Sequence, residues 1–257
     1  AFAPSGIGAR EAIVSIANND ADENPYDFAI QGRGVDLATP QAIPYAQDFA
    51  GGTPGASEGW SLKTIGNGVI EVRSGALHLD QAHDAGGVFG LNEAVLHLDS
   101  AGKSGLMLSL DQIDDGDEAH AMPTSPFTGS HNGDGVAISN DGETWYPVLN
   151  FGATATHEVD LDAALAGYGV DPAIFYADGL QVKFQQYDNY ASVDGRAIDN
   201  VKVETLTPQA IPYAQDFAGD TPGAGEGWSL QTTGNGVIEM RSGALHLDQA
   251  HDAGGVF

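Results

Sequence analysis

The chain contains no cysteine among its 257 residues. Disulfides and Cys–His catalysis are therefore excluded. A large extracellular eukaryotic protein would usually carry disulfides, so this acidic, glycine-rich chain is more typical of a secreted bacterial protein that metal stabilises instead. No stretch is apolar over the length that a membrane span requires. No signal peptide is visible, which decides little because the chain opens at Ala1 in mid-pattern.

Basic residues are also scarce, with 9 Lys and Arg against 36 Asp and Glu and a formal charge of −27. Nucleic acid and anionic membranes would be repelled by this charge, which makes them poor partners. Two interpretations of the carboxylates stay open. They form a solvated surface that keeps the protein soluble in salt, or some of them converge on divalent cations, and we expect both.

A long internal repeat is present. Thr39–Phe89 recurs as Thr207–Phe257, 168 residues later, with five substitutions. These are Gly52/Asp220, Ser57/Gly225, Lys63/Gln231, Ile65/Thr233 and Val72/Met240. The period is domain-sized and exceeds the roughly 20–50 residues of solenoids and propellers. We therefore predict three parts, residues 1–37, 38–205 and 206–257. The third is the first portion of a second unit, for which either the natural chain continues or a partner supplies strands by β-augmentation.

Within the complete unit, apolar residues alternate with polar ones as in half-buried strands. "LQVKFQQY" places Leu180, Val182 and Phe184 inside and, on the opposite face, Gln181, Lys183 and Gln185. The one good helix candidate covers residues 162–166, with Asp160 as its cap and Gly167 as its stop. Eight or more strands with one short helix predict an all-β protein whose complete unit is a jelly-roll β-sandwich.

Two segments resemble known families. "AIVSIANNDADENPYDFAIQGRG" predicts two strands, and it resembles the last hairpin of bacterial Ig-like "choice-of-anchor" repeats. The segments "PYAQDFAGGTPG", "DGVAISNDGETWYPV" and "VKFQQYDNYASVDGRAIDNVKV" resemble bacterial jelly-roll modules of the MAM-like or concanavalin-like kind. The resemblance implies a partial Ig-like sandwich followed by jelly-roll units on a secreted or surface protein, often with a structural calcium. Here Asp199-Asn200 stands where that family often has two acidic residues.

Calcium is the cofactor that the acidic residues predict. Asp48 and Asp199 lie in the first and last strands of the unit, which can be neighbours in a jelly roll, and Asp194 is close by in sequence. The loop "DQIDDGDEAH" places several carboxylates together, which is repulsive without a cation or water. A solvated acidic turn is the alternative. The predicted metal ligands are Asp48, Asp114, Asp115, Asp117, Asp194, Asp199 and Asp216, the last being the counterpart of Asp48 in the repeat.

Two further patterns suggest sugar chemistry. Glu158, Asp160 and Asp162 alternate as in the acidic strand of concanavalin-like glycoside hydrolases, but Asp160 is better placed as a helix cap. Trp145 and Tyr146 point to opposite faces of a strand, so one enters the core. The other could stack on sugar rings together with Tyr187 or Tyr190.

The sequence therefore predicts a secreted, cell-surface structural module without catalytic residues. Near-identical tandem units suit an adhesin stalk, a sheath or an extracellular filament, with neighbouring repeats or copies of the chain as partners. A carbohydrate-binding module that contacts polysaccharide is the alternative, and a glycoside hydrolase is the third hypothesis.

Overall fold

The computed structural model describes residues 8–19, 22, 24–34, 38–82, 89–189, 194–206, 215–218, 221–223, 226–230, 232 and 236–249. The chain divides into two compact units, Ala1–Ala38 and Thr39–Phe257. Almost all regular structure is β, which confirms the predicted fold class. None of the helices in the described residues is long and apolar enough to cross a membrane.

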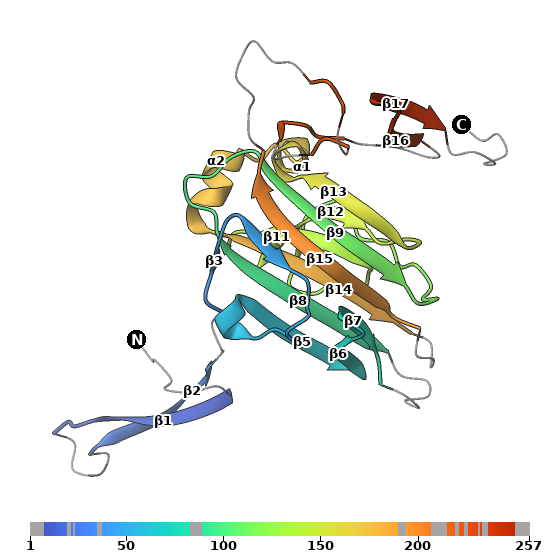
Figure 1. Cartoon of the computed structure of the whole chain (residues 1–257). Helices are drawn as coiled ribbons and strands as arrows, with labels where there is room; N and C mark the ends of the chain where they lie inside the picture. The colour runs from blue at the N-terminus through green and yellow to red at the C-terminus, as the bar shows by residue number, and fades with distance from the viewer. Residues whose placement is uncertain are drawn as a thin grey trace. The chain divides into compact units, whose positions relative to one another are not determined.

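The first unit is a β-hairpin (Figure 1). Its strands β1 (Gly8–Ile16) and β2 (Tyr26–Gly34) pair antiparallel, as the sequence predicts. The side chains of Ile13 and Ile16 on β1 and of Tyr26 and Phe28 on β2 are largely exposed.

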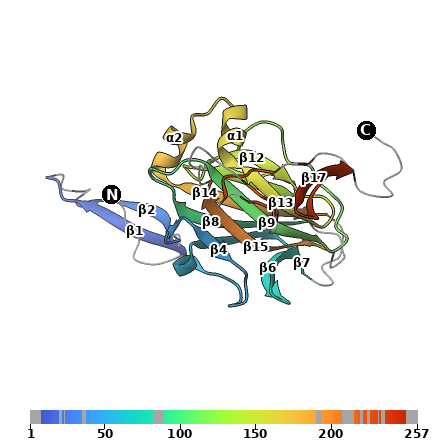
Figure 2. The same ribbon diagram turned by 45° about the horizontal axis from the view of Figure 1, so that its top comes forward.

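The second unit contains two sheets that pack face to face (Figure 2). In the first sheet, β12, β11, β14 and β8 lie in that order, and β8 pairs on its other edge with β5 and β3. This sheet comprises β3 (Gln41–Ala42), β5 (Trp60–Gly66), β8 (Gly90–Asp99), β10 (Phe127–Thr128), β11 (Gly135–Ser139), β12 (Thr144–Asn150) and β14 (Leu180–Asp188).

In the second sheet, β15 is central and pairs with β9 on one edge and with β7 and β4 on the other. This sheet comprises β4 (Tyr45–Gln47), β6 (Gly68–Arg73), β7 (Ala76–Gln81), β9 (Leu106–Asp114), β13 (Ala155–Asp160) and β15 (Arg196–Thr205). The early strand β4 and the last strand of the sandwich, β15, are therefore neighbours, with Gln47 opposite Val201.

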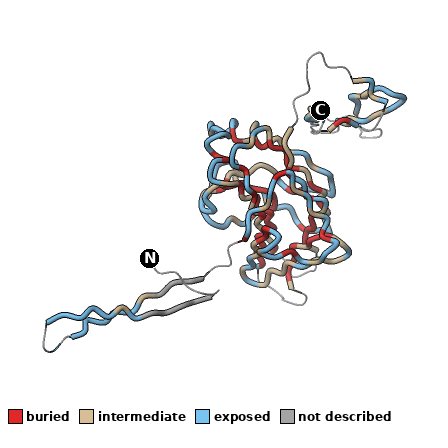
Figure 3. Tube along the Cα trace, turned by 60° about the vertical axis from the view of Figure 1, so that its left-hand side comes forward, coloured by how far each residue is buried: buried red, intermediate tan, exposed pale blue. Residues whose placement is uncertain are grey.

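The core fills the space between the sheets (Figure 3). Alternate residues of each strand face inward, so Leu106, Leu108 and Leu110 of β9 meet Val182 and Phe184 of β14 in one cluster. Each such side chain contributes about 1.5–3 kcal/mol when fully buried. The predicted inward set of β14 is confirmed.

The outer face of the first sheet is also covered, which the sequence did not predict. Lys183 and Gln185 point away from the core, yet both are buried. The segment 115–134 crosses over them, because Lys183 Nζ donates to Gly129 O and Gln185 Nε2 donates to His131 O. A second apolar cluster forms here from Met122, Ala137 and Trp145, with Val95 and Phe127 packed against it.

Two short α-helices and two 3-10 helices complete the sandwich. Helix α1 (Leu161–Gly167) has the predicted cap, since Asp160 accepts a hydrogen bond from Ala163 N, but it begins one residue earlier than predicted and continues through Gly167 to a C-cap at Tyr168. The 3-10 helix η1 (Ala56–Glu58) precedes β5, while α2 (Pro172–Phe175) and the 3-10 helix η2 (Tyr176–Asp178) follow α1.

The repeated sequence forms the same hairpin twice. Strands β16 (Gly236–Arg241) and β17 (Ala244–Gln249) pair in the register of β6 and β7. The Arg73–Asp80 ion pair of the first hairpin recurs as Arg241–Asp248. This local structure is therefore reproduced by both copies.

Candidate divalent-cation site and the adjoining aromatic patch

The interior of the sandwich becomes polar at one end. On β14 the inward positions continue from Phe184 to Gln186 and Asp188, and on β15 Arg196 precedes the inward Ile198. These polar side chains are all buried. Because side chains two apart share a face, the same alternation that builds the core carries carboxylate, amide and guanidinium groups between the sheets.

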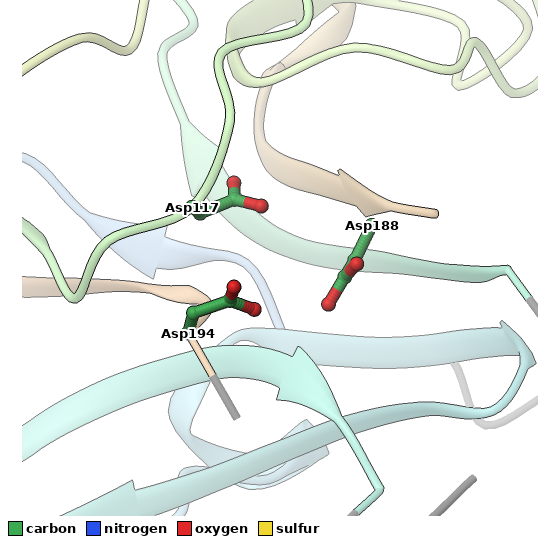
Figure 4. A group of neighbouring side chains, drawn as sticks. All are labelled: Asp117, Asp188 and Asp194. Atoms are coloured by element: carbon green, nitrogen blue, oxygen red, sulfur yellow. The ribbon is translucent and has the colours of Figure 1, made fainter. Parts of the chain in front are cut away.

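Three aspartates come together at this end (Figure 4). Asp117 follows β9, Asp188 is the last residue of β14, and Asp194 lies just before β15. Each offers one carboxylate oxygen, and these three oxygens lie within 4.8 Å of one another. Within the part of the chain that the structure describes, no other group of three acidic, histidine or cysteine side chains meets this condition.

Backbone contacts hold the segments that carry these aspartates. Asp115 N donates to Gly195 O at 3.1 Å, which places the start of the segment 115–134 beside β15. Gly195 itself lies against β7, since a Cβ at this position would be 2.2 Å from Leu79 O. Only glycine permits this close approach, which fixes the backbone next to Asp194.

One guanidinium faces the carboxylates. Arg196 is 1% exposed, and its Nε lies 2.9 Å from Asp117 Oδ2 and 3.8 Å from Asp134 Oδ2. Its Nη2 and Nη1 donate to the main-chain oxygens of Asp117 and Gly152. The Arg196 guanidinium therefore forms ion pairs with two buried carboxylates, those of Asp117 and Asp134.

The excess of buried carboxylates over positive charge is accompanied by raised pKa values. Burial and then the Asp134 carboxylate raise the pKa of Asp117 to about 8, although Arg196 and the Gln186 side chain oppose the rise. Burial also raises the pKa of Asp134, despite its hydrogen bonds from the backbone of Tyr187 and His120. At neutral pH this end of the sandwich favours taking up a positive charge, either as a proton or as a cation.

The predicted ligands fall in different places. Asp117 and Asp194 belong to the group of three, and Asp114 and Asp115 lie beside it, close to Arg196 and His78 respectively. Sequence reasoning missed Asp188, although its position four residues after Phe184 gives it the inward face. The assignment of metal to these residues stays a prediction.

The carboxylates of the other predicted ligands accept hydrogen bonds from backbone N–H groups instead. Asp48 is exposed and accepts a hydrogen bond from Ala50 N, and Asp216 receives the same bond from Ala218 N. Asp199 accepts from Asn200 N. Although β4 and β15 are neighbours, the described residues around Asp48 and Asp199 do not assemble a third ligand.

Two members of the acidic trio of the hydrolase hypothesis, Asp160 and Asp162, have structural roles. Asp160 caps α1, and Asp162 accepts hydrogen bonds from Gly105 N, Leu106 N and the Tyr176 hydroxyl. Asp162 is therefore occupied in holding a turn and a tyrosine. Both aspartates of the trio are engaged in structural hydrogen bonds, which disfavours them as the paired acid and base of a glycosidase.

An aromatic patch lies on the outside of the polar end. We define it as Phe89, His120, Tyr187 and Asn189. The rings of Phe89 and Tyr187 are 6.2 Å apart, and His120 meets the Tyr187 ring edge-on at 4.9 Å. Asn189 is exposed and its Nδ2 lies 2.9 Å from His120 Nε2, and Phe89 is 44% exposed. Since Tyr187 and Asp188 are consecutive on β14, the patch adjoins the three aspartates across the strand.

The aromatic platform predicted at Trp145 or Tyr146 is wrong. Trp145 is buried beneath the Lys183 ammonium, which is 3.9 Å from the ring centroid. Tyr146 is half-buried and packs edge-on against Tyr168 and Phe175. Tyr187 does lie in the patch, while Tyr190 falls outside the described residues.

Comparison with known proteins gives only distant structural likenesses. No family model matches the chain, and no curated protein matches it. The solved structures that match in part include an exo-beta-agarase at 10% identity, over 64% of this chain and 26% of its own, with a TM-score of 0.39. This chain thus spans about a quarter of the length of that protein. A carbohydrate-binding module of the β-sandwich superfamily matches at 13% identity over 79% of this chain and 76% of its own, with a TM-score of 0.32. The Family 11 carbohydrate-binding module from Clostridium thermocellum matches at 16% identity over 62% of this chain and 93% of its own, with a TM-score of 0.34.

Proposed function

We propose that this chain is an extracellular, non-catalytic module that binds carbohydrate through its aromatic patch. The observation that carries the proposal is the exposed Phe89 ring beside Tyr187, flanked by the side chains of His120 and Asn189. These groups combine an apolar surface with hydrogen-bonding partners at one place on the sandwich.

The chemistry of the patch suits a sugar ring. A pyranose presents C–H groups on its faces and hydroxyls at its rim, so an aromatic face covers the first while polar side chains bond the second. Asn189 offers both an amide donor and a carbonyl acceptor, and His120 offers a ring nitrogen of either kind. A few oriented polar groups around an apolar surface are typical of small-ligand sites.

Binding to a panel of soluble polysaccharides, measured by affinity electrophoresis and on a glycan array, tests the proposal. The wild-type chain should bind at least one glycan, and Phe89→Ala and Tyr187→Ala should each weaken that binding at least tenfold. Ile174→Ala is the matched control, since Ile174 is 71% exposed on α2, away from the patch in sequence and contacts. An absence of binding across the panel, or equal losses in the control, contradicts the proposal.

A structural role in a tandem array is the second candidate. It is favoured by the near-identity of the two copies and by the hairpin that both form with the same ion pair. In this role the partners are neighbouring repeats or other copies of the chain. Electron micrographs of the purified protein that show fibres with a regular, domain-sized axial repeat would support it, and dispersed particles would oppose it.

A further inference from the structure

We propose that Asp117, Asp188 and Asp194 bind one divalent cation, Ca²⁺ in preference to Mg²⁺, between the ends of three segments of the sandwich. This site is separate from the proposed sugar contacts and does not depend on them. It places two of the sequence-predicted ligands in one group and adds Asp188.

The first support is the convergence of the ligands. Three carboxylate oxygens within 4.8 Å of one another come from the segment after β9, from the end of β14 and from the residue two before β15. Figure 4 shows the three carboxylates turned toward a common space. Bringing three negative groups this close is unfavourable unless positive charge lies between them.

The second support is a buried oxygen that lacks a donor. The Asp117 side chain is fully buried, and its Oδ2 accepts from Arg196 Nε. Its Oδ1 is also buried and has no hydrogen-bond partner. A buried carboxylate oxygen without a hydrogen-bond donor loses a large part of its hydration energy, and coordination to a cation offsets that cost.

Charge and ligand type indicate calcium. All three ligands are hard carboxylate oxygens, with no histidine or cysteine in the group, which disfavours zinc and copper. Calcium takes six to eight oxygens in flexible geometry, and main-chain carbonyls and water complete its shell readily. Magnesium requires a near-ideal octahedron and gives up its water reluctantly, so three carboxylates fixed by two sheets and a loop suit it less.

A cation here would fasten the segment 115–134 to the sandwich. Asp117 lies near the start of that segment, whereas Asp188 and Asp194 end β14 and precede β15. The bound ion would therefore join both sheets and the covering segment at a single point. We expect its main effect to be on the stability of the fold.

The test uses the whole chain, stripped with EDTA and then titrated with CaCl₂ or MgCl₂ while thermal unfolding and heat of binding are recorded. For the wild type, millimolar Ca²⁺ should raise Tm by several degrees, and Mg²⁺ should raise it less. Asp188→Asn should lose this response and, without metal, should melt at or above the wild-type Tm because one repelling charge is gone.

Asp48→Asn combined with Asp216→Asn is the matched control, since both aspartates are exposed carboxylates of the repeat. The control should keep the full response to Ca²⁺. Should Asp188→Asn fail to fold, as judged by circular dichroism, Asp194→Asn at the more exposed position replaces it. The proposal is overturned if Ca²⁺ leaves the wild-type Tm unchanged, or if the variant at Asp188 or Asp194 responds like the wild type.

Discussion

At the scale of single residues, two histidines are held in their neutral form. Burial lowers the pKa of His97, whose ring nitrogen lies 3.1 Å from Ser61 Oγ. Burial also lowers the pKa of His157, although the nearby Asp111 opposes this. Both therefore bind a proton less readily in the folded state than in the unfolded chain.

The lowered pKa values of these histidines make the folded state less stable as pH falls. As pH falls through about 6.5, the unfolded chain protonates these histidines before the folded state does, so their contribution favours unfolding. We predict that His97→Gln, which keeps a polar partner for Ser61, gains stability relative to the wild type between pH 7.5 and pH 5.5. Urea unfolding of both proteins at the two pH values gives the comparison. A stability difference that is constant with pH contradicts the prediction.

At the scale of elements, the segment 115–134 is attached to the first sheet by hydrogen bonds to a buried ion pair within that sheet. Lys183 Nζ lies 2.8 Å from Glu93 Oε1, and both side chains are almost fully buried. Burial raises the pKa of Glu93, but hydrogen bonds from Lys183 and Lys63 outweigh it and hold the pKa below its usual value. The same ammonium donates to Gly129 O and lies over Trp145.

We predict that Lys183→Ala destabilises the sandwich by about 3 kcal/mol, because it leaves Glu93 buried with less compensation. Lys63→Ala is the comparison, since Lys63 also pairs with Glu93 but its side chain is 57% exposed. It should cost less than about 1 kcal/mol, and the repeat has Gln231 at this position. Denaturant unfolding followed by circular dichroism measures both. Equal losses for the two variants would show that burial does not set the cost.

The comparison of sequence prediction and structure separates local signals from long-range packing. Local signals were sufficient for Asp160 as a helix cap and for the inward set Leu180, Val182 and Phe184, because capping and alternation depend on adjacent residues. Lys183 was predicted to face outward, and it does leave the core. It is buried nevertheless, because a segment more than fifty residues earlier folds over it.

The candidate site shows the same limit. Asp117 and Asp194 were found because they stand in acidic or family-like stretches. Asp188 stands alone between Tyr187 and Asn189, and only the pairing of β14 within the sheet brings it to the others. Residues that meet through long-range packing leave no spacing signal in a single sequence.

At the scale of the whole molecule, the predicted all-β sandwich is confirmed, whereas the boundaries at residues 38 and 206 and the stalk or filament role stay predictions. The repeat contributed most to the expectation of a modular protein. The two hairpins, which differ in sequence only at Val72/Met240, have the same local pairing. The net charge of −27 gives no such positional information, since most of the carboxylates act on solubility and only a few act at a site.

The covering of the first sheet by residues 115–134 restricts how a polymer could be held. If the aromatic patch binds carbohydrate as proposed, this cover keeps a polymer off the part of the first sheet around Lys183 and Gln185, and its contact with the protein would centre on the rim where Phe89 and Tyr187 lie, over a short run of sugar units. We therefore expect a trisaccharide to inhibit binding nearly as well, mole for mole, as the long chain from which it is cut. Competition isothermal titration with oligosaccharides of increasing length measures this, and affinity that keeps climbing beyond about four units would instead indicate a groove. A module that contacts only a few sugar units would bind chain ends and side branches of a polysaccharide. It would leave the main chain of the polymer accessible to other proteins.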